Sequence, residues 1–119
     1  MATALYNRGE KLTVDYTASG AAVVVDEVVV IGGSVGVSFD ALADGETGTA
    51  DIGGCYIFPK TSGAVIAAGE TVDWNATNGE VDDNAAVGAD VADFGVALES
   101  AGDGVTMIAV KLLPGNTPV

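Results

Sequence analysis

The sequence predicts an all-β domain, either a small β-barrel or a β-sandwich, with an extended N-terminal arm. Two segments 59 positions apart share one pattern: Gly-Val, an acidic residue three positions later, and an Asp-Gly turn. They begin at Gly36 and Gly95, and their turns are Asp44-Gly45 and Asp103-Gly104. Asp and Gly tolerate the left-handed backbone of tight turns, so each copy predicts a strand, a turn and a returning strand. Val, Ala and Gly dominate the composition while aromatic residues make up 6%, which suits closely spaced strands.

The first third of the chain predicts an arm and three strands. Residues 1–9 have no periodic pattern and are expected to form the arm, with residues 10–119 as the single β domain. Residues 11–16 alternate apolar and polar side chains, as a strand with one buried face does. Residues 22–31 form a β-branched run that predicts buried strand structure. After Gly32-Gly33, a further strand is expected over 35–39.

The rest of the chain supplies the remaining strands. Residues 49–58 predict one strand with a bulge at Gly53-Gly54. Residues 71–75 and 80–82 flank Asn78-Gly79, which predicts a hairpin. Residues 82–91 predict a loop with at most one helical turn, and the last strands are expected over 94–99 and 105–113. This gives eight or nine short strands.

The charge balance limits the possible partners. Seventeen acidic and four basic residues give a formal net charge of −13. Such a chain repels phosphate backbones, so we expect no nucleic-acid partner. The most apolar stretch, residues 21–37, is interrupted by Asp26-Glu27 and Gly32-Gly33, so we expect no membrane span. No secretory signal is visible at the N-terminus, which predicts a protein made in a cytoplasm.

The sequence offers little for catalysis or metal binding. Histidine is absent, and Cys55, the single cysteine, lies in an apolar run and is expected to be buried. A zinc site is therefore not expected. The segment Gly32-Gly33-Ser34-Val35-Gly36 matches a nucleophile elbow, but the elbow needs a histidine base, so the match is taken as a turn. We predict no enzyme activity, no catalytic residues and no cofactor.

Two weaker possibilities concern charged side chains. Oxygen-bearing residues gather in one stretch without matching the calcium loop of an EF-hand, which leaves weak cation binding open: Asp73, Asn75, Asn78, Gly79, Asp82 and Asp83. Lys60 follows Pro59 in a turn but lacks the neighbours of a modified carrier lysine. No two carboxylates are singled out as a hydrolase pair.

The order of several short segments resembles the small cement proteins of tailed-phage capsids. The resemblance runs over roughly residues 9–113 and rests on these pieces: Leu12-Thr13-Val14, Gly36-Val37, Ala43-Asp44-Gly45-Glu46, Phe58-Pro59-Lys60, Gly63-Ala64, Ala68-Gly69-Glu70-Thr71-Val72, Trp74, Gly95-Val96-Ala97 and Val110-Lys111-Leu112. The acidic segment from Glu80 to Asp93 departs from the family pattern.

The resemblance implies a non-catalytic decoration protein on the outer surface of a virion, bound to the shell of the major capsid protein and commonly a homotrimer. In the arm, Leu5 and Tyr6 would form an apolar anchor beside Arg8, and these three residues are the expected capsid contacts. The alternatives are a small-molecule or glycan-binding β-barrel and, as a third class, a carboxylate-dependent hydrolase.

Overall fold

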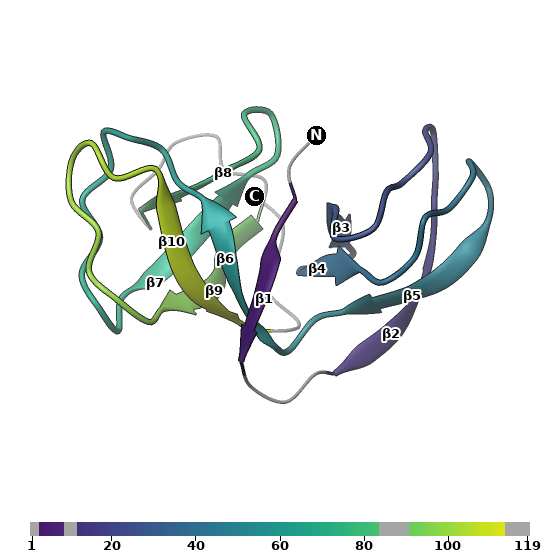
Figure 1. Ribbon diagram of the computed structural model, residues 1–119, viewed down its shortest axis with the longest axis horizontal. Helices are drawn as coiled ribbons and strands as arrows, with labels where there is room; N and C mark the ends of the chain where they lie inside the picture. Colours follow the sequence, from purple (N-terminus) through teal and green to yellow (C-terminus); the bar gives the residue numbers. More distant parts are fainter. Residues whose placement is uncertain (1–2, 9–11, 84–90, 114–119) are drawn as a thin grey trace.

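The computed structural model describes residues 3–8, 12–83 and 91–113, which form ten strands and no helix. The strands are β1 (Leu5–Arg8), β2 (Thr13–Thr17), β3 (Val28–Ile31), β4 (Ser34–Ser38), β5 (Thr47–Asp51), β6 (Cys55–Pro59), β7 (Thr71–Asn75), β8 (Glu80–Asp83), β9 (Val91–Ala97) and β10 (Met107–Leu112). They form two antiparallel sheets, which lie on either side of the view in Figure 1. The all-β prediction is confirmed. Neither sheet closes into a barrel, so the sandwich is the better of the two architectures predicted.

The two sheets repeat one arrangement of four strands. The four-stranded sheet has the order β2-β5-β4-β3, and four neighbours in the six-stranded sheet have the order β6-β10-β9-β7. Strand for strand, these are the same topology. The larger sheet adds β1 beside β6 and β8 beside β7.

The register is also repeated, which shows that the likeness is more than a shared strand order. Three pairs in the smaller sheet, Tyr16↔Gly48, Val28↔Val37 and Ser38↔Ala50, correspond to Phe58↔Ile108, Thr71↔Val96 and Ala97↔Val110 in the larger one. Corresponding residues are 42 positions apart in β2 and β6, 43 in β3 and β7, 59 in β4 and β9, and 60 in β5 and β10. The repeat predicted from the sequence is therefore confirmed, and it extends beyond the segments that first suggested it.

Three turns of the same construction lead into β3, β5 and β7. They span residues 24–27, 43–46 and 67–70, and each ends in a glutamate. In each, the glutamate N–H donates to the first carbonyl, and the third residue has a φ of 67°, 87° or 86°. This is type II turn geometry. The glutamate Oε1 also accepts the N–H of the first residue at 3.0–3.1 Å, so one side chain closes each turn.

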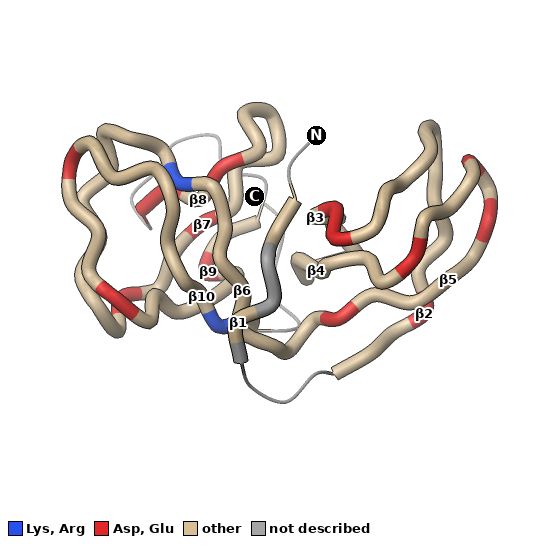
Figure 2. Tube along the Cα trace, in the orientation of Figure 1, with Lys and Arg blue, Asp and Glu red and all other residues tan. Residues whose placement is uncertain are grey.

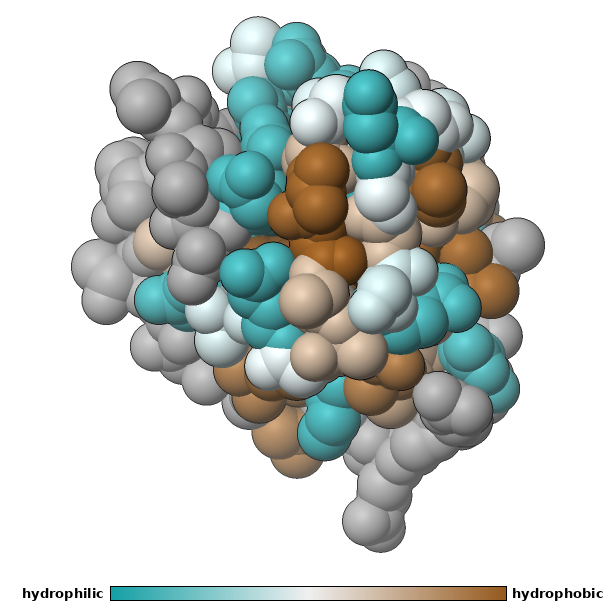
Figure 3. All heavy atoms as spheres, turned by 90° about the vertical axis from the view of Figure 1, so that its left-hand side faces the viewer, coloured by the Kyte–Doolittle hydropathy of each residue, from teal (hydrophilic) through white to brown (hydrophobic). Residues whose placement is uncertain are grey.

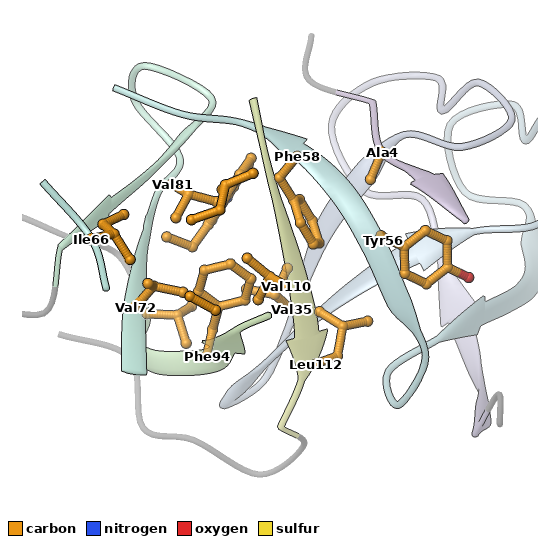
Figure 4. Packing of buried hydrophobic residues seen from close by; sticks show 14 of the residues in the cluster. Ala4, Val35, Tyr56, Phe58, Ile66, Val72, Val81, Phe94, Val110 and Leu112 are labelled. Carbon is orange, nitrogen blue, oxygen red and sulfur yellow. The ribbon is translucent and has the colours of Figure 1, made fainter. Parts of the chain in front are cut away.

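Two clusters of buried apolar side chains hold the sheets together. The larger cluster fills the concave side of the six-stranded sheet and includes Val35 and Val37 of β4 (Figure 4). At its centre Phe58 packs against Trp74 and Phe94, with ring centroids 5.9 and 5.4 Å apart. The smaller cluster belongs to the four-stranded sheet and comprises Ala18, Val23, Val29, Leu42 and Ala50. Because β4 contributes to the larger cluster, that cluster joins the two halves, while the smaller one belongs to the four-stranded sheet alone.

Several element predictions require correction. The run 22–31 does break at Asp26-Glu27, but only 28–31 form a strand, β3, because residues 24–27 form a turn in which Val24 and Val25 are exposed. The segment 49–58 is two strands, β5 and β6, and the bend at residues 52–54 carries the chain from one sheet to the other. The Asn78-Gly79 hairpin is confirmed, with Gly79 at φ 69°. The loop expected over 82–91 falls mostly on residues 84–90, outside the described residues.

Candidate functional site

The predicted contact residues Leu5, Tyr6 and Arg8 lie on β1 at the edge of the six-stranded sheet. Their backbones are paired with Ile57, Tyr56 and Cys55 of β6, with an irregularity between residues 6 and 8. Among the described residues, no strand pairs with β1 on its other side. The boundary expected between arm and domain, after residue 9, lies outside the described residues.

The residues just before β1 connect the two halves of the molecule. The Ala4 N–H donates to the carbonyl of Asp26 at 2.9 Å, and Thr3 forms an antiparallel bridge with Glu27. Ala4 is completely buried in the larger cluster. Part of the segment expected to form the arm therefore contributes to the core.

Asp51, at the end of β5, is a buried carboxylate at the junction of the sheets. Its Oδ1 accepts the backbone N–H groups of Leu12, Gly53 and Gly54, and its Oδ2 accepts the hydroxyl of Tyr56. A Cβ added at Gly54 would lie 2.6 Å from Oδ2, so only glycine leaves room for this arrangement. The carboxylate fixes the bend between β5 and β6.

Lys60 is a buried cation with a similar structural task. It is 1% exposed, and its Nζ donates to the carbonyls of Thr61, Gly102 and Val105 at 2.7, 3.2 and 3.1 Å. The turn at residues 102–105 corresponds to the turn at 43–46 but has Val105 where the other has a glutamate. This turn therefore has no glutamate to accept its first N–H. Instead, Lys60 stabilises it by donating hydrogen bonds to the carbonyls of Gly102 and Val105.

A groove of about 730 Å³ separates β3 from the β7–β8 hairpin. Its lining combines apolar residues with two carboxylates: Thr3, Tyr16, Glu27, Val28, Val29, Val30, Pro59, Trp74, Ala76, Thr77, Asn78, Gly79 and Glu80. Burial, and then the nearby charge of Glu27, raise the pKa of the Tyr16 hydroxyl. Because the Tyr16 hydroxyl keeps its proton to a higher pH than usual, it provides this groove with a hydrogen-bond donor rather than a base.

The surface of the described residues is strongly acidic. Carboxylates lie along the turns at both ends, whereas the cations whose side chains the structure describes are Lys60, which is buried, and Lys111 (Figure 2). Figure 3 shows the end formed by the connections before β7 and before β10, where apolar side chains lie among hydrophilic ones. Val65, Val105 and Met107 belong to this part of the chain and are 66%, 42% and 44% exposed.

The stretch considered for calcium contains one buried acid. Asp73 is 3% exposed, and its Oδ1 accepts the Asp93 N–H at 2.8 Å. Burial raises the pKa of Asp73, and the charges of Asp93, Asp83 and Asp82 raise it further, against the lowering effect of that hydrogen bond. Among the described residues, no three Cys, Asp or Glu side chains are placed to hold a metal ion together.

Sequence reasoning missed the roles of Asp51 and Lys60, and it also missed the closed turns. A signal for the turns was present, since Ala-x-Gly-Glu-Thr occurs at both 43–47 and 67–71. For Asp51, three of the four donors lie within the next five residues, at Gly53, Gly54 and Tyr56, and only the contact with Leu12 is distant in the chain. Cys55 is buried, as predicted. Within the described residues no helix has the length and apolarity that a bilayer span requires.

One of the comparisons with known proteins gives a match. No curated protein and no solved structure matches the chain. A family model described as phage cement protein matches residues 7–112, a span that includes both repeated halves and the strands that join them. Nothing in that match favours a glycan binder or a hydrolase. The chain therefore belongs to the phage cement protein family and has the role of a capsid cement protein.

Proposed function

We propose that this protein decorates the outer surface of an assembled phage head as a non-catalytic homotrimer that attaches partly through β1. The observation that carries the proposal is the family match over residues 7–112. A protein that binds the assembled shell and not its free subunits stabilises the shell by mass action. The site of synthesis would be the host cytoplasm, and the site of action the virion.

The hydrogen bonds made by the buried charged side chains support a structural role without catalysis. Asp51 and Lys60 are both almost fully buried, and each is saturated by hydrogen bonds within the fold. Every buried side-chain nitrogen and oxygen of the described residues has a hydrogen-bond partner. A catalytic acid or base needs a free face toward substrate, and neither group has one.

For attachment, we propose that Leu5, Tyr6 and Arg8 contact the capsid protein. They lie on a strand that pairs with no described strand on its outer side, and Arg8 is one of four basic residues in a chain of net charge −13. Removing residues 2–8 would also remove buried Ala4, so point variants are the sharper test. Arg8→Glu should weaken binding to bare shells in a sedimentation assay while leaving the melting temperature unchanged.

The matched control for this test is Lys111→Glu, which reverses the charge of an exposed lysine on β10. It should bind shells better than Arg8→Glu does. Equal losses in the two variants would indicate a general effect of charge and would remove β1 from the proposed contact. Wild-type protein that fails to bind its own shells would contradict the proposed function itself.

The trimer is proposed because closed cyclic symmetry lets a small subunit cover open strand edges. Three chains bring 39 formal negative charges together, so salt should favour association by screening their repulsion. Sedimentation equilibrium at low and high salt tests this point. A monomer at high concentration under both conditions would exclude a trimer in solution.

A further inference from the structure

The four-stranded sheet ends at β2, whose counterpart in the six-stranded sheet is β6. In the six-stranded sheet the equivalent edge of β6 is already covered by β1. In the six-stranded sheet β1 pairs with β6 on the side away from β10. By the repeated register, β2 is the counterpart of β6, and no described strand pairs with β2 on the side away from β5. The molecule itself therefore shows that this fold accepts an antiparallel strand at that position.

The backbone groups that would receive such a strand can be identified. Ala18 N–H donates to the Glu46 carbonyl, and Ile52 N–H donates to the Leu12 carbonyl. Hydrogen bonds in an antiparallel ladder alternate, so between these two rungs Thr13, Asp15 and Thr17 direct their N–H and C=O groups away from β5. All three side chains are exposed.

These three residues are the counterparts of the groups that hold β1. With a separation of 42 positions, Thr13 and Asp15 correspond to Cys55 and Ile57, whose Cα partners are Arg8 and Leu5. Thr17 corresponds to Pro59, which has no N–H to donate. The open edge of β2 thus offers one more donor than the edge that β1 already covers.

We propose that the edge of β2 binds an extended segment of the capsid protein as an added antiparallel strand. The proposal rests on the cement function proposed above and names the surface that would carry it. Strand addition gives affinity through main-chain hydrogen bonds and specificity through the alternating side chains. Asp15 lies at the middle of the edge in a chain of net charge −13, so the segment should carry a lysine or arginine opposite it. A second copy paired through the same edge would bring its own Asp15 against this one, a like-charge contact that is destabilising, so the proposed trimer would use other edges.

Hydrogen exchange of the wild-type protein gives the direct test. The amides of Thr13, Asp15 and Thr17 should exchange rapidly in the free protein and at least about tenfold more slowly on bare shells. Val14 and Tyr16, whose amides point to β5, should be protected in both states and serve as internal controls. Unchanged exchange of the three amides on shells to which the protein is bound would overturn the proposal. Protection already present in the free protein at high concentration would assign the edge to a second copy and would also overturn it.

Substitution provides the second arm. Asp15→Pro removes the outward N–H without removing a hydrogen bond to β5, a position where an edge strand tolerates proline. It should keep the fold by circular dichroism and lose at least about tenfold in shell affinity. Asp15→Asn keeps the N–H and should stay within about threefold of the wild type. If Asp15→Pro folds and binds shells like Asp15→Asn, the strand-addition proposal is wrong. Wild-type protein that does not bind shells would instead refute the cement role, so the two failures are distinguishable.

Discussion

The Tyr56 hydroxyl donates a hydrogen bond of 2.7 Å to Oδ2 of Asp51, which ties the last residue of β5 to the second residue of β6. This bond spans the bend where the chain leaves one sheet and enters the other. Asp51 is fully buried and Tyr56 is 1% exposed, so water cannot replace the hydroxyl if it is lost. The pair is the polar centre of an otherwise apolar junction.

Tyr56→Phe should lower the free energy of unfolding by about 1–3 kcal/mol, because it leaves a buried carboxylate oxygen without its donor. Chemical denaturation followed by tryptophan fluorescence measures the change. Tyr16→Phe, at a half-buried ring, is the matched control and should change stability by less than about 0.5 kcal/mol. Equal effects of the two variants would show that the Asp51 contact does not stabilise the junction.

Lys60→Met should destabilise the protein by at least about 2 kcal/mol, since three carbonyls lose a charged donor while the apolar volume is kept. The control is Lys111→Met, which removes an exposed lysine whose Nζ donates to a single carbonyl, that of Gly53. It should cost less than about 1 kcal/mol. A Lys60 variant as stable as the Lys111 variant would contradict the structural role of the buried cation.

The raised pKa of Asp73 predicts a dependence of stability on pH. The folded protein holds this proton more tightly than the unfolded chain, so the contribution of Asp73 to stability falls as pH rises from the ordinary aspartate range through the raised pKa. Asp73→Asn keeps an oxygen to accept the Asp93 N–H, and it should stabilise the protein at neutral pH and less so in acid.

The readout is the difference between variant and wild type in the free energy of unfolding, measured at neutral pH and near about pH 4.5. Asp103→Asn removes the same charge from an exposed turn and corrects for general repulsion. A gain at neutral pH that is equal for the two variants would show that burial of Asp73 has no particular effect.

The closed turns predict opposite outcomes for two kinds of glycine. Gly45→Ala and Gly69→Ala should each cost about 1–2 kcal/mol, because both residues have positive φ, which disfavours a side chain even in open space. Gly63→Ala is the control, since its added Cβ meets nothing within 4 Å and its φ is not positive. It should be neutral or stabilise slightly by restricting the unfolded chain. Thermal melts that rank Gly63→Ala with the other two would contradict the turn assignment.

The sequence was sufficient for the parts of the fold that depend on local pattern. Alternation identified β2, the Asn-Gly pair identified the β7–β8 hairpin, and the repeated Asp-Gly turns identified the two halves. It failed where tertiary contacts decide. Residues 49–58 are interrupted at Asp51 and Gly53-Gly54, a pattern that suits a bulge as well as a bend, and the contact of Asp51 with the distant Leu12 N–H belongs to the tertiary structure.

The N-terminal segment shows the same limit for the candidate site. Nothing in Leu5, Tyr6 or Arg8 indicates pairing with β6, because a four-residue edge strand is too short to show periodicity. The contact role of these residues stays a prediction. The open edge of β2 could not be recognised at all until the register of the two halves was known.

The repeated register has a consequence for folding, because each half contains strands that could pair with the wrong partner. A refolding chain could place β5 beside β6, or β10 beside β2, because these strands hold equivalent positions in the two sheets. Side-chain volume opposes both errors. Gly48 of β5 faces Asp40 so closely that an added Cβ would lie 2.6 Å from its carboxylate, whereas its counterpart in β10 is Ile108. If β5 instead paired with β6, the small residues of β5 would leave a cavity beside Phe58. The fidelity of assembly is thus encoded in the sizes of a few side chains on otherwise interchangeable strands.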